Sequence, residues 1–302
     1  MTDGFTSSIH LFEYQPEKIK IGTVYHYVKS NIDGTNPADV SIYVASRQRV
    51  EVLKIEQGST LPAYVTADFD WESFSAVRLD SWHIIEDGSL RRQLESHLSR
   101  ENNTYTAYLE GGIFSADVGH YPLHNYNFDF ISFNFIFRHL IDPEQKFAIG
   151  VVEPNWDVIL SPDFSPTGEA TDVLRYKGKA LIEFLGADTY RDVDCRKYRI
   201  SGEGMDEQVG FFWANIEHGH FENFEHPHPD NPAWDSFKFD LRSIEYMTLA
   251  EWKEFIAARH KEMLERNGSI DGLDGEINDQ PRPAACGQIK KTAAPIGAPP
   301  FC

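Results

Sequence analysis

A period-two alternation of apolar and polar residues recurs along most of the chain and constrains the fold more than any other feature. In SFKFDLRSIEYM, Phe237, Phe239 and Leu241 alternate with charged residues, and DVSIYVASR and VDCRKYRI repeat the pattern. Because successive side chains of a β-strand point to opposite faces, each segment predicts a strand with one buried and one solvated face. Roughly a dozen such segments lie between residues 18 and 247, which predicts a mainly β, antiparallel fold.

Turn residues separate these segments at short intervals. Asp87-Gly88 stands between DSWHIIE and SLRRQLESHL, and we expect a hairpin with a type I′ turn there. Asp33-Gly34 and Gly111-Gly112 mark further turns. No repeat with a period of about 20–50 residues is visible, so a propeller or solenoid is not expected. The pattern is that of an all-β sandwich or barrel.

The stretch HYPLHNYNFDFISFNFIFRHL, residues 120–140, breaks the strand pattern. From Tyr126 to Phe130 its aromatic residues occupy even positions, and from Phe133 they occupy odd positions, which a single strand cannot place on one face. A helix over 129–140, with Asp129 as N-cap, puts most of the phenylalanines on one stripe, and Asp142-Pro143 stops it. A helix this aromatic must be buried, so we predict that it plugs the concave face of a barrel, with HYPLHNYN as a loop at the rim.

A second helix is predicted over residues 248–266 and is expected to pack outside the barrel. Thr248 and Glu251 form a capping box, Trp252 belongs to an apolar stripe, and Asn267-Gly268 is expected to end the helix. These boundaries divide the chain into an N-terminal arm (1–17), a single β-barrel-like domain (18–267) and a Gly/Pro/Ala-rich tail (268–302), which is expected to be flexible.

Charge and hydropathy narrow the range of partners. The net charge of −19 argues against nucleic acid and anionic membrane surfaces, because both bind basic patches. No run of about 18 apolar residues predicts a membrane span. The N-terminus lacks the basic and apolar segments of a secretory signal, so we expect a cytoplasmic protein with reduced thiols at Cys195, Cys286 and Cys302. An oligomeric state stays open.

Residues 176–254 carry a resemblance to known proteins. KGKALIEFLGADTYR leads into the cysteine-containing VDCRKYRISG, followed by EQVGFFWAN with its tryptophan, HFENFEHP, and SFKFDLRSIEYM before a helix. This order resembles the lipoprotein-carrier-like, broadly lipocalin-like group of half-open antiparallel barrels, and the violacein-pathway protein that rearranges an indole intermediate has a similar fold. The resemblance implies a half-open barrel, here with an aromatic plug helix and a C-terminal helix.

On such a fold we expect a protein that encloses a small apolar or aromatic molecule and acts on it as a cofactor-independent lyase or isomerase. A binding or carrier protein without catalysis is the alternative. A second alternative is a metal-dependent enzyme that uses the histidine-rich segment 218–228, although its spacing matches no standard zinc motif and a solvated turn explains it better. Signatures of nucleotide, nucleophile-elbow and dithiol sites are missing, so neither a cofactor nor a metal is expected.

Four residues are candidates for proton transfer, namely His124, His83, Tyr126 and His26. His124 and Tyr126 belong to the predicted rim loop. His83 shares its strand face with apolar residues, so it either serves as a buried base or is simply hydrogen-bonded in the core. His26 sits on a strand whose two faces cannot be assigned from the sequence.

Aromatic and charged residues near these positions are candidates for ligand binding. Tyr25 and Tyr27 would suit an aromatic ligand if their strand face points inward, and Arg138 would pair with a ligand carboxylate or phenolate. A cation in the last helical turn also has an ordinary explanation in the helix dipole, and the plug helix has one in core packing. The full set is Tyr25, Tyr27, Trp82, His120, Asp129, Phe133, Arg138 and Trp213.

Overall fold

The computed structural model describes residues 6–109, 111–165 and 172–271, and within them fifteen strands form one sheet. Their order across the sheet is β11-β12-β13-β14-β15-β16-β17-β2-β3-β4-β5-β6-β7-β8-β9. In chain order they are β2 (Thr23–Ser30), β3 (Ala38–Val44), β4 (Arg49–Glu56), β5 (Ala63–Asp70), β6 (Ser75–Ile84), β7 (Leu90–Ser99), β8 (Thr104–Leu109), β9 (Gly112–Asp117), β11 (Leu123–Asn125), β12 (Phe147–Pro154), β13 (Leu174–Tyr190), β14 (Val193–Ser201), β15 (Gly210–Asn215), β16 (Phe221–His226) and β17 (Phe237–Tyr246).

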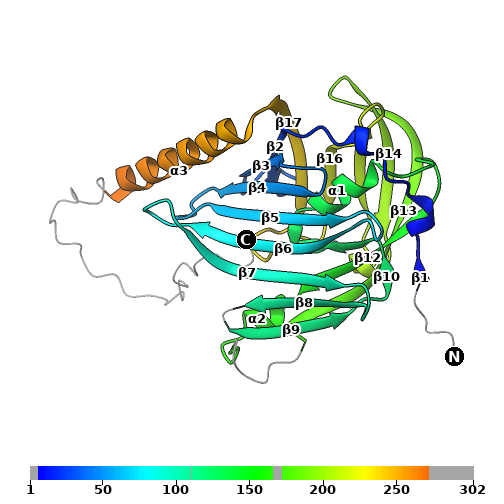
Figure 1. The fold of residues 1–302 in the computed structure, drawn as a ribbon, viewed down its shortest axis with the longest axis horizontal. Coiled ribbons are helices and arrows are strands. Elements are labelled where there is room, and N and C mark those ends of the chain that lie inside the picture. The colour runs from blue at the N-terminus through cyan, green and yellow to red at the C-terminus, as the bar shows by residue number, and fades with distance from the viewer. Residues whose placement is uncertain (1–5, 110, 166–171, 272–302) are drawn as a thin grey trace, which may run out of the picture.

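This sheet curls into an open barrel (Figure 1). Its neighbours pair antiparallel except β11 and β12, which run parallel. The two ends of the strand order, β9 and β11, are not paired with each other, so the barrel is not closed. A separate two-stranded sheet joins β1 (Thr6–Ser7) to β10 (His120–Tyr121). The prediction of a mainly β, antiparallel half-open barrel is therefore confirmed.

The alternation read from the sequence matches the two faces of the sheet. Phe237 and Phe239 are fully buried on the concave side, as the pattern of β17 predicted. On β2 the structure assigns the faces that the sequence left open. Tyr25 and Tyr27 belong to the core inside the barrel, whereas His26 points outward and contacts the C-terminal helix through Phe255.

The predicted plug helix is present as α1 (Ile131–Phe137), preceded by the 3₁₀ helix η3 (Tyr126–Phe128). All seven residues of α1 are buried, and Phe133 lies 5.4 Å from Phe212 and 5.2 Å from Phe221, ring centre to ring centre. The predicted N-cap is wrong. Asp129 and Phe130 have φ values of +47° and +55°, so the chain makes a left-handed step before the helix begins.

The lead-in HYPLHNYN is not a loop at the rim. Its residues form β10 and β11, and His124 pairs with Val151 of β12 in a parallel register. The backbone of this segment needs partners because it runs through the core, and pairing with β12 supplies them. Both His120 and His124 are consequently buried, and the expectation of an exposed cavity entrance here is wrong.

Two further expectations about the ends of elements need correction. The hairpin at Asp87-Gly88 joins β6 to β7, as predicted. However, only Gly88 has a positive φ (+82°), and the amide of Ile85 donates to the carbonyl of Ser89. The connection is therefore a longer turn than type I′. The C-terminal helix α3 runs over Leu249–Asp271 and therefore continues through Asn267-Gly268. Residues 272–302 of the predicted flexible tail lie outside the described part of the chain.

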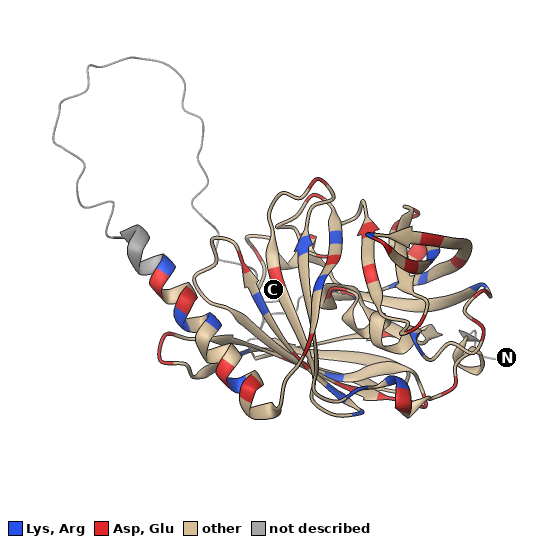
Figure 2. Ribbon diagram, turned by 90° about the horizontal axis from the view of Figure 1, so that it is seen from above, with Lys and Arg blue, Asp and Glu red and all other residues tan. Residues whose placement is uncertain are grey.

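Helix α3 lies on the convex side of the barrel, as expected (Figure 1), and residues of both charges recur along it (Figure 2). Its capping box is confirmed, since the Thr248 amide donates to Glu251 at 2.7 Å. Trp252 is fully buried, stacks on Tyr43 at 5.2 Å and donates from Nε1 to Glu51 at 2.8 Å. A second, small core therefore joins α3 to the sheet.

The remaining short helices are η1 (Ile9–Leu11), η2 (Pro16–Lys18), α2 (Trp156–Ile159) and η4 (Glu203–Met205). None of the helices in the described ranges is long and apolar enough to cross a membrane.

Candidate functional site

A solvent-open hollow of about 600 Å³ lies where η2, the start of β2, the end of β17 and the turn between β15 and β16 meet the end of α1. Apolar and charged side chains share its wall. Those used below are Lys18, Tyr25, Arg138, His218, His220 and Tyr246. The hollow has the size of a small-molecule site, and such sites combine an apolar wall with a few polar groups.

Arg138 is the most unusual residue of this wall. It follows the last residue of α1 and is only 3% exposed. Its Nη1 donates to the Tyr25 hydroxyl at 3.2 Å, and its guanidinium lies 4.7 Å from the centre of the Phe135 ring. Its Nε and Nη2 have no hydrogen-bond partner, and no carboxylate within the described residues forms an ion pair with it.

A buried cation without a counter-ion is costly in an isolated protein, and an anion bound beside it recovers that cost. Both unpartnered nitrogens of Arg138 are shielded from solvent. An anion in the hollow would therefore contact the Tyr25 hydroxyl and be attracted by the Arg138 charge beyond it. Because Tyr25 accepts the hydrogen bond from Arg138, its own proton stays available to a ligand oxygen. The Tyr25 hydroxyl can therefore donate a hydrogen bond while it accepts one from Arg138.

His220 occupies the same wall and is held by a carboxylate. Its Nε2 lies 2.9 Å from Glu222, which also accepts from Asn215 at 2.8 Å. The His220 ring centre is 5.4 Å from that of Tyr25, and Nδ1 has no partner within the described part of the chain. Burial lowers the pKa of His220, and the Glu222 hydrogen bond opposes this shift, so the imidazole is neutral at pH 7 and can accept a proton.

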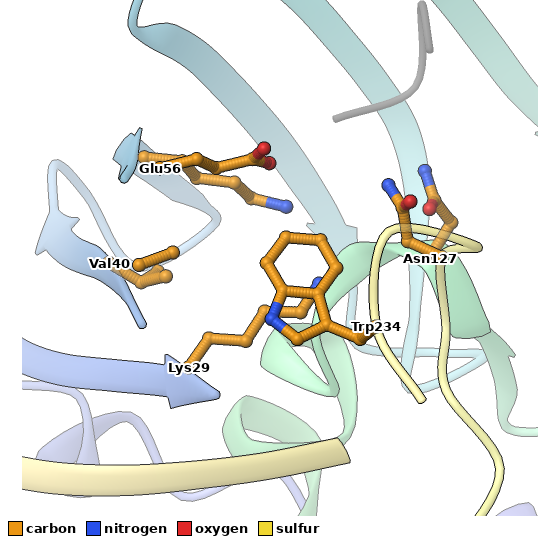
Figure 3. A pocket seen from close by; sticks show the side chains of 8 residues that line it. Lys29, Val40, Glu56, Asn127 and Trp234 are labelled. Atoms are coloured by element: carbon orange, nitrogen blue, oxygen red, sulfur yellow. The ribbon is translucent and has the colours of Figure 1, made fainter. Parts of the chain in front are cut away.

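A second group of charges is closed off inside the barrel. The Lys29 amine lies 2.8 Å from both Asp129 and Asp230, and Lys54 also contacts Asp129. Trp234 covers Lys29, with its ring centre 3.9 Å from the amine (Figure 3). The space left beside them is about 10 Å³, enough for no more than one water molecule.

These four charges therefore compensate one another inside the barrel. Burial would raise the pKa of Asp129, but the attraction of Lys29 and Lys54 outweighs it and lowers that pKa. Burial and the neighbouring charge of Asp129 raise the pKa of Asp230 to about 7, against the effect of Lys29. Asp129 was expected to bind a ligand, and the structure places it in this cluster instead.

The candidates for proton transfer do not gather at one place. His124 is fully buried against Phe130 at 4.6 Å, its Nδ1 contacts the Ser132 hydroxyl, and burial lowers its pKa to about 3. Tyr126 donates to the backbone carbonyl of His228 at 2.6 Å, and burial raises its pKa. Both side chains are core residues, because β11 and η3 run through the interior.

His83 and His26 lie elsewhere on the sheet. His83 is half-buried near the end of β6, where burial lowers its pKa. His26 faces outward, and its Nδ1 lies 2.9 Å from the Ser41 hydroxyl. Neither lines the hollow beside Arg138.

Of the predicted ligand-binding residues, Tyr25 and Arg138 line the hollow together. Tyr27 is a core residue that donates to the carbonyl of Phe221 at 2.8 Å, and Phe133 is packed in the plug. His120 is buried near Ser8 at 3.1 Å.

The two tryptophans that were predicted to bind a ligand contact other side chains at the surface. Trp82 packs against Tyr64 and Arg92, with ring and guanidinium distances of 5.8 and 5.7 Å. Trp213 donates from Nε1 to Asp188 at 2.9 Å and lies 4.6 Å from the Lys197 amine. Neither reaches the hollow.

The sequence missed the part of the wall that comes from the turn between β15 and β16. His218 and His220 were considered only as metal ligands within segment 218–228. The structure separates this segment, because His218 and His220 line the hollow whereas His226 lies near Tyr126. No group of three or more His, Cys, Asp or Glu side chains within residues 6–109, 111–165 and 172–271 is placed to hold a metal ion.

No family model and no curated protein matches the chain. Among solved structures it is similar to a Vibrio parahaemolyticus domain assigned as an outer membrane lipoprotein-sorting protein, with 7% identity and a TM-score of 0.27 over 75% of this chain and 86% of that one. A Bacteroides fragilis protein assigned as exported, with a YmcC-like fold, has 12% identity and a TM-score of 0.24 over 75% and 96%.

A DUF1329 family protein from Desulfovibrio piger has 9% identity and a TM-score of 0.26 over 76% of this chain and 88% of that one. The Vibrio parahaemolyticus domain is of the lipoprotein-sorting kind that residues 176–254 resemble. At such TM-scores the likeness carries no argument about a ligand or an activity, which must come from the site itself.

Proposed function

We propose that this protein binds a small molecule with an apolar or aromatic body and an anionic group, such as a carboxylate, in the hollow beside Arg138. The observation that carries the proposal is the buried guanidinium of Arg138, which has no carboxylate partner within the described residues. A protein that did not bind an anion here would retain the cost of a buried charge that only the Tyr25 hydroxyl and the Phe135 ring partly offset.

The wall supplies a complementary partner for each part of such a molecule. Tyr25, Ile244 and Tyr246 offer apolar and aromatic surface to the body. The Tyr25 hydroxyl and the cation behind it face the anionic group, and Lys18 adds a second positive charge nearby. The wall also carries three glutamates, which would repel an anion, so the preference for an anionic group rests on the buried Arg138.

Two fluorescent probes that differ mainly in charge test the proposal. 8-Anilinonaphthalene-1-sulfonate is anionic, and N-phenyl-1-naphthylamine has the same ring system without the charge. Arg138→Gln should weaken binding of the anionic probe about tenfold, or about 1.4 kcal/mol, the order of a charge–charge interaction across a few ångströms in a partly solvated site. Binding of the neutral probe should stay within about twofold.

Two controls separate binding from folding. Arg91→Gln removes an exposed arginine of β7 and should change neither affinity. The urea midpoint of Arg138→Gln without probe should stay close to that of the unaltered protein, because the lost hydrogen bond to Tyr25 is offset by removal of a buried charge that no carboxylate balances. Equal weakening of both probes, or of neither, would overturn the proposal.

A second candidate function is proton transfer on the bound molecule, as in a cofactor-independent lyase or isomerase. The arrangement of Glu222, His220 and Tyr25 favours it, because a carboxylate orients a neutral imidazole beside a hydroxyl donor. Native mass spectrometry of the purified protein would identify a co-purifying molecule. Its conversion by the protein, and loss of that conversion in His220→Gln with binding retained, would separate this candidate from binding alone.

A further inference from the structure

A second hollow, of about 280 Å³, lies on the convex side of the sheet beneath α3. Its wall includes Ser41, His26, Glu245, Phe255, Arg242 and Arg259. The function proposed above uses neither Ser41 nor His26, and this hollow opens on the opposite side of β2 from Tyr25. The group of side chains within it needs an explanation of its own.

Three neighbouring strands bring the group together. His26 on β2 is the direct register partner of Ser41 on β3, and on the other side it pairs with Ser243 on β17, two residues before Glu245. Residues two apart on a strand share a face, so Glu245 reaches the same side of the sheet as its neighbour. The antiparallel pairing thus places a hydroxyl, an imidazole and a carboxylate in a row.

Distances within the row indicate the direction of proton transfer. The Ser41 hydroxyl lies 2.9 Å from His26 Nδ1, and Glu245 lies 3.8 Å from His26 Nε2. Nε2 has no hydrogen-bond partner within the described residues, so the nearest charge to it is that carboxylate. A carboxylate favours the tautomer with the proton on Nε2, which leaves Nδ1 as the acceptor of the Ser41 proton.

Titratable and charged groups reach His26 from three elements. Burial lowers the pKa of His26, Glu245 on β17 and Asp39 on β3 raise it, and Arg259 on α3 lowers it. The net effect is a lowered pKa, so the imidazole is neutral at pH 7. A neutral imidazole beside a hydroxyl is the form that a general base requires.

We propose that Ser41, His26 and Glu245 form a nucleophile, base and orienting carboxylate that hydrolyse short-chain carboxylic esters. Ser41 Oγ attacks the ester carbonyl while His26 Nδ1 takes its proton, and His26 returns that proton to the departing alcohol. Water then attacks the acyl-serine, its proton passes through His26 to Ser41, and the carboxylic acid leaves. Ser41 lies within β3 and not on the strand-to-helix turn of a nucleophile elbow, so no sequence motif marks this group and only its geometry identifies it.

Size and charge of the hollow define the substrate class. A volume of about 280 Å³ admits a short acyl chain against the ring of Phe255. Arg242 and Arg259 are the cationic donors of the wall and would stabilise the developing oxyanion, although each is also paired with an aspartate, Asp240 and Asp39 respectively.

Covalent labelling tests the proposal without a known substrate. Diisopropyl fluorophosphate forms a bond from phosphorus to an activated serine oxygen and releases fluoride. Intact-mass and peptide analysis of the full chain should find one diisopropylphosphoryl group, located on Ser41. Ser41→Ala should abolish labelling, and His26→Gln should slow it at least about a hundredfold, the usual contribution of a general base.

A matched control guards against an effect on folding. Ser81→Ala removes another buried strand serine, whose hydroxyl has no partner within the described residues. In this variant Ser41 should be labelled at the same rate as in the unaltered protein. Labelling of Ser41 that is unaffected by His26→Gln, or no labelling of Ser41 in a folded protein, would overturn the proposal and leave the Ser41 contact as a cross-strand hydrogen bond only.

Glu245 acts through His26 and is therefore a positioning residue. Its carboxylate raises the pKa of His26, so Glu245→Gln should move the midpoint of the pH profile of labelling to lower pH. A purely structural role would change the rate without moving the midpoint. An unshifted midpoint would remove Glu245 from the group.

Discussion

At the residue scale, the core holds several imidazoles that stay neutral because water cannot reach them. His124, His139 and His226 are all fully buried. Burial lowers the pKa of His124 and His139 to about 3 and that of His226 to about 4. In the unfolded chain these groups titrate near their ordinary value of about 6.5. Folding is therefore coupled to proton release in acid.

This coupling predicts how stability depends on pH. A folded pKa below the unfolded one means that stabilisation is complete above about pH 6.5 and is lost as pH falls toward the folded value. Each histidine then contributes a slope of about 1.4 kcal/mol per pH unit within that window. The raised pKa of Asp230 has the opposite effect on stability. Between the unfolded pKa of this carboxyl and about pH 7 it makes the protein more stable as pH falls, so it offsets part of the stability lost through the histidines.

The contribution of one residue can be isolated with His124→Gln. Urea unfolding at pH 7, 6 and 5 should give a free energy of unfolding that depends less steeply on pH in the variant, by about 1.4 kcal/mol per unit near pH 5. Parallel curves for the variant and the unaltered protein would show that His124 binds a proton in the folded state. Asp129 does not interfere, because its lowered pKa confines its effect to more acidic solution.

Single residues were only partly predictable from the sequence. Tyr25 and Arg138 were both predicted to bind a ligand, and the structure brings them into contact although they lie more than a hundred positions apart; their binding of a ligand stays a prediction. The alternation of β2 showed that Tyr25 and His26 face opposite ways but could not say which faces inward, because both faces of this strand are covered, one by α1 and one by α3.

At the element scale, the fully buried Trp252 packs α3 against the sheet. Trp252 fills the space between the helix and Tyr43, and its Nε1 donates to Glu51, which also accepts from Tyr64 at 2.7 Å. Trp252→Ala should lower the free energy of unfolding by about 3–5 kcal/mol, as expected for a large aromatic residue removed from a core. Urea titration followed by circular dichroism measures it.

Two substitutions calibrate that prediction. Trp252→Phe keeps an aromatic ring against Tyr43 but loses the hydrogen bond to a carboxylate and part of the buried indole, so its cost should be about 1–2 kcal/mol. Leu249→Ala, on the same helix but 49% exposed, should change stability by less than about 0.5 kcal/mol. If Trp252→Ala costs no more than Leu249→Ala, α3 is not held by this contact.

Elements with a strong period were predicted better than those fixed by tertiary contacts. The parity switch between Phe130 and Phe133 correctly indicated a helix. It could not reveal that β10 and β11 precede it, since these short strands form only because β1 and β12 offer them partners. The left-handed residues Asp129 and Phe130 are likewise set by the buried lysines that hold Asp129, and no local pattern encodes such a contact.

At the scale of the whole molecule, one sheet connects nearly every strand, and a single core cluster extends through it. The sequence predicted this open barrel because its turns and alternation are local, whereas the hollow beside Arg138 is assembled from five elements and had no local signal. The boundaries of the single domain and the cytoplasmic location stay predictions.

A buried thiol can test whether the sheet unfolds as one unit. Cys195 lies on β14, is fully buried, and burial raises the pKa of its thiol to about 11. A variant with serine at Cys286 and Cys302, both outside the described residues, leaves it as the only thiol. If residues 18–267 form one cooperative domain, the urea midpoint for modification of Cys195 by a thiol reagent should coincide with the midpoint from far-ultraviolet circular dichroism. Because β14 lies in the half of the sheet distant from β5 and β6, exposure of Cys195 at a lower urea concentration would show that the two halves unfold separately and that the single-domain prediction is wrong.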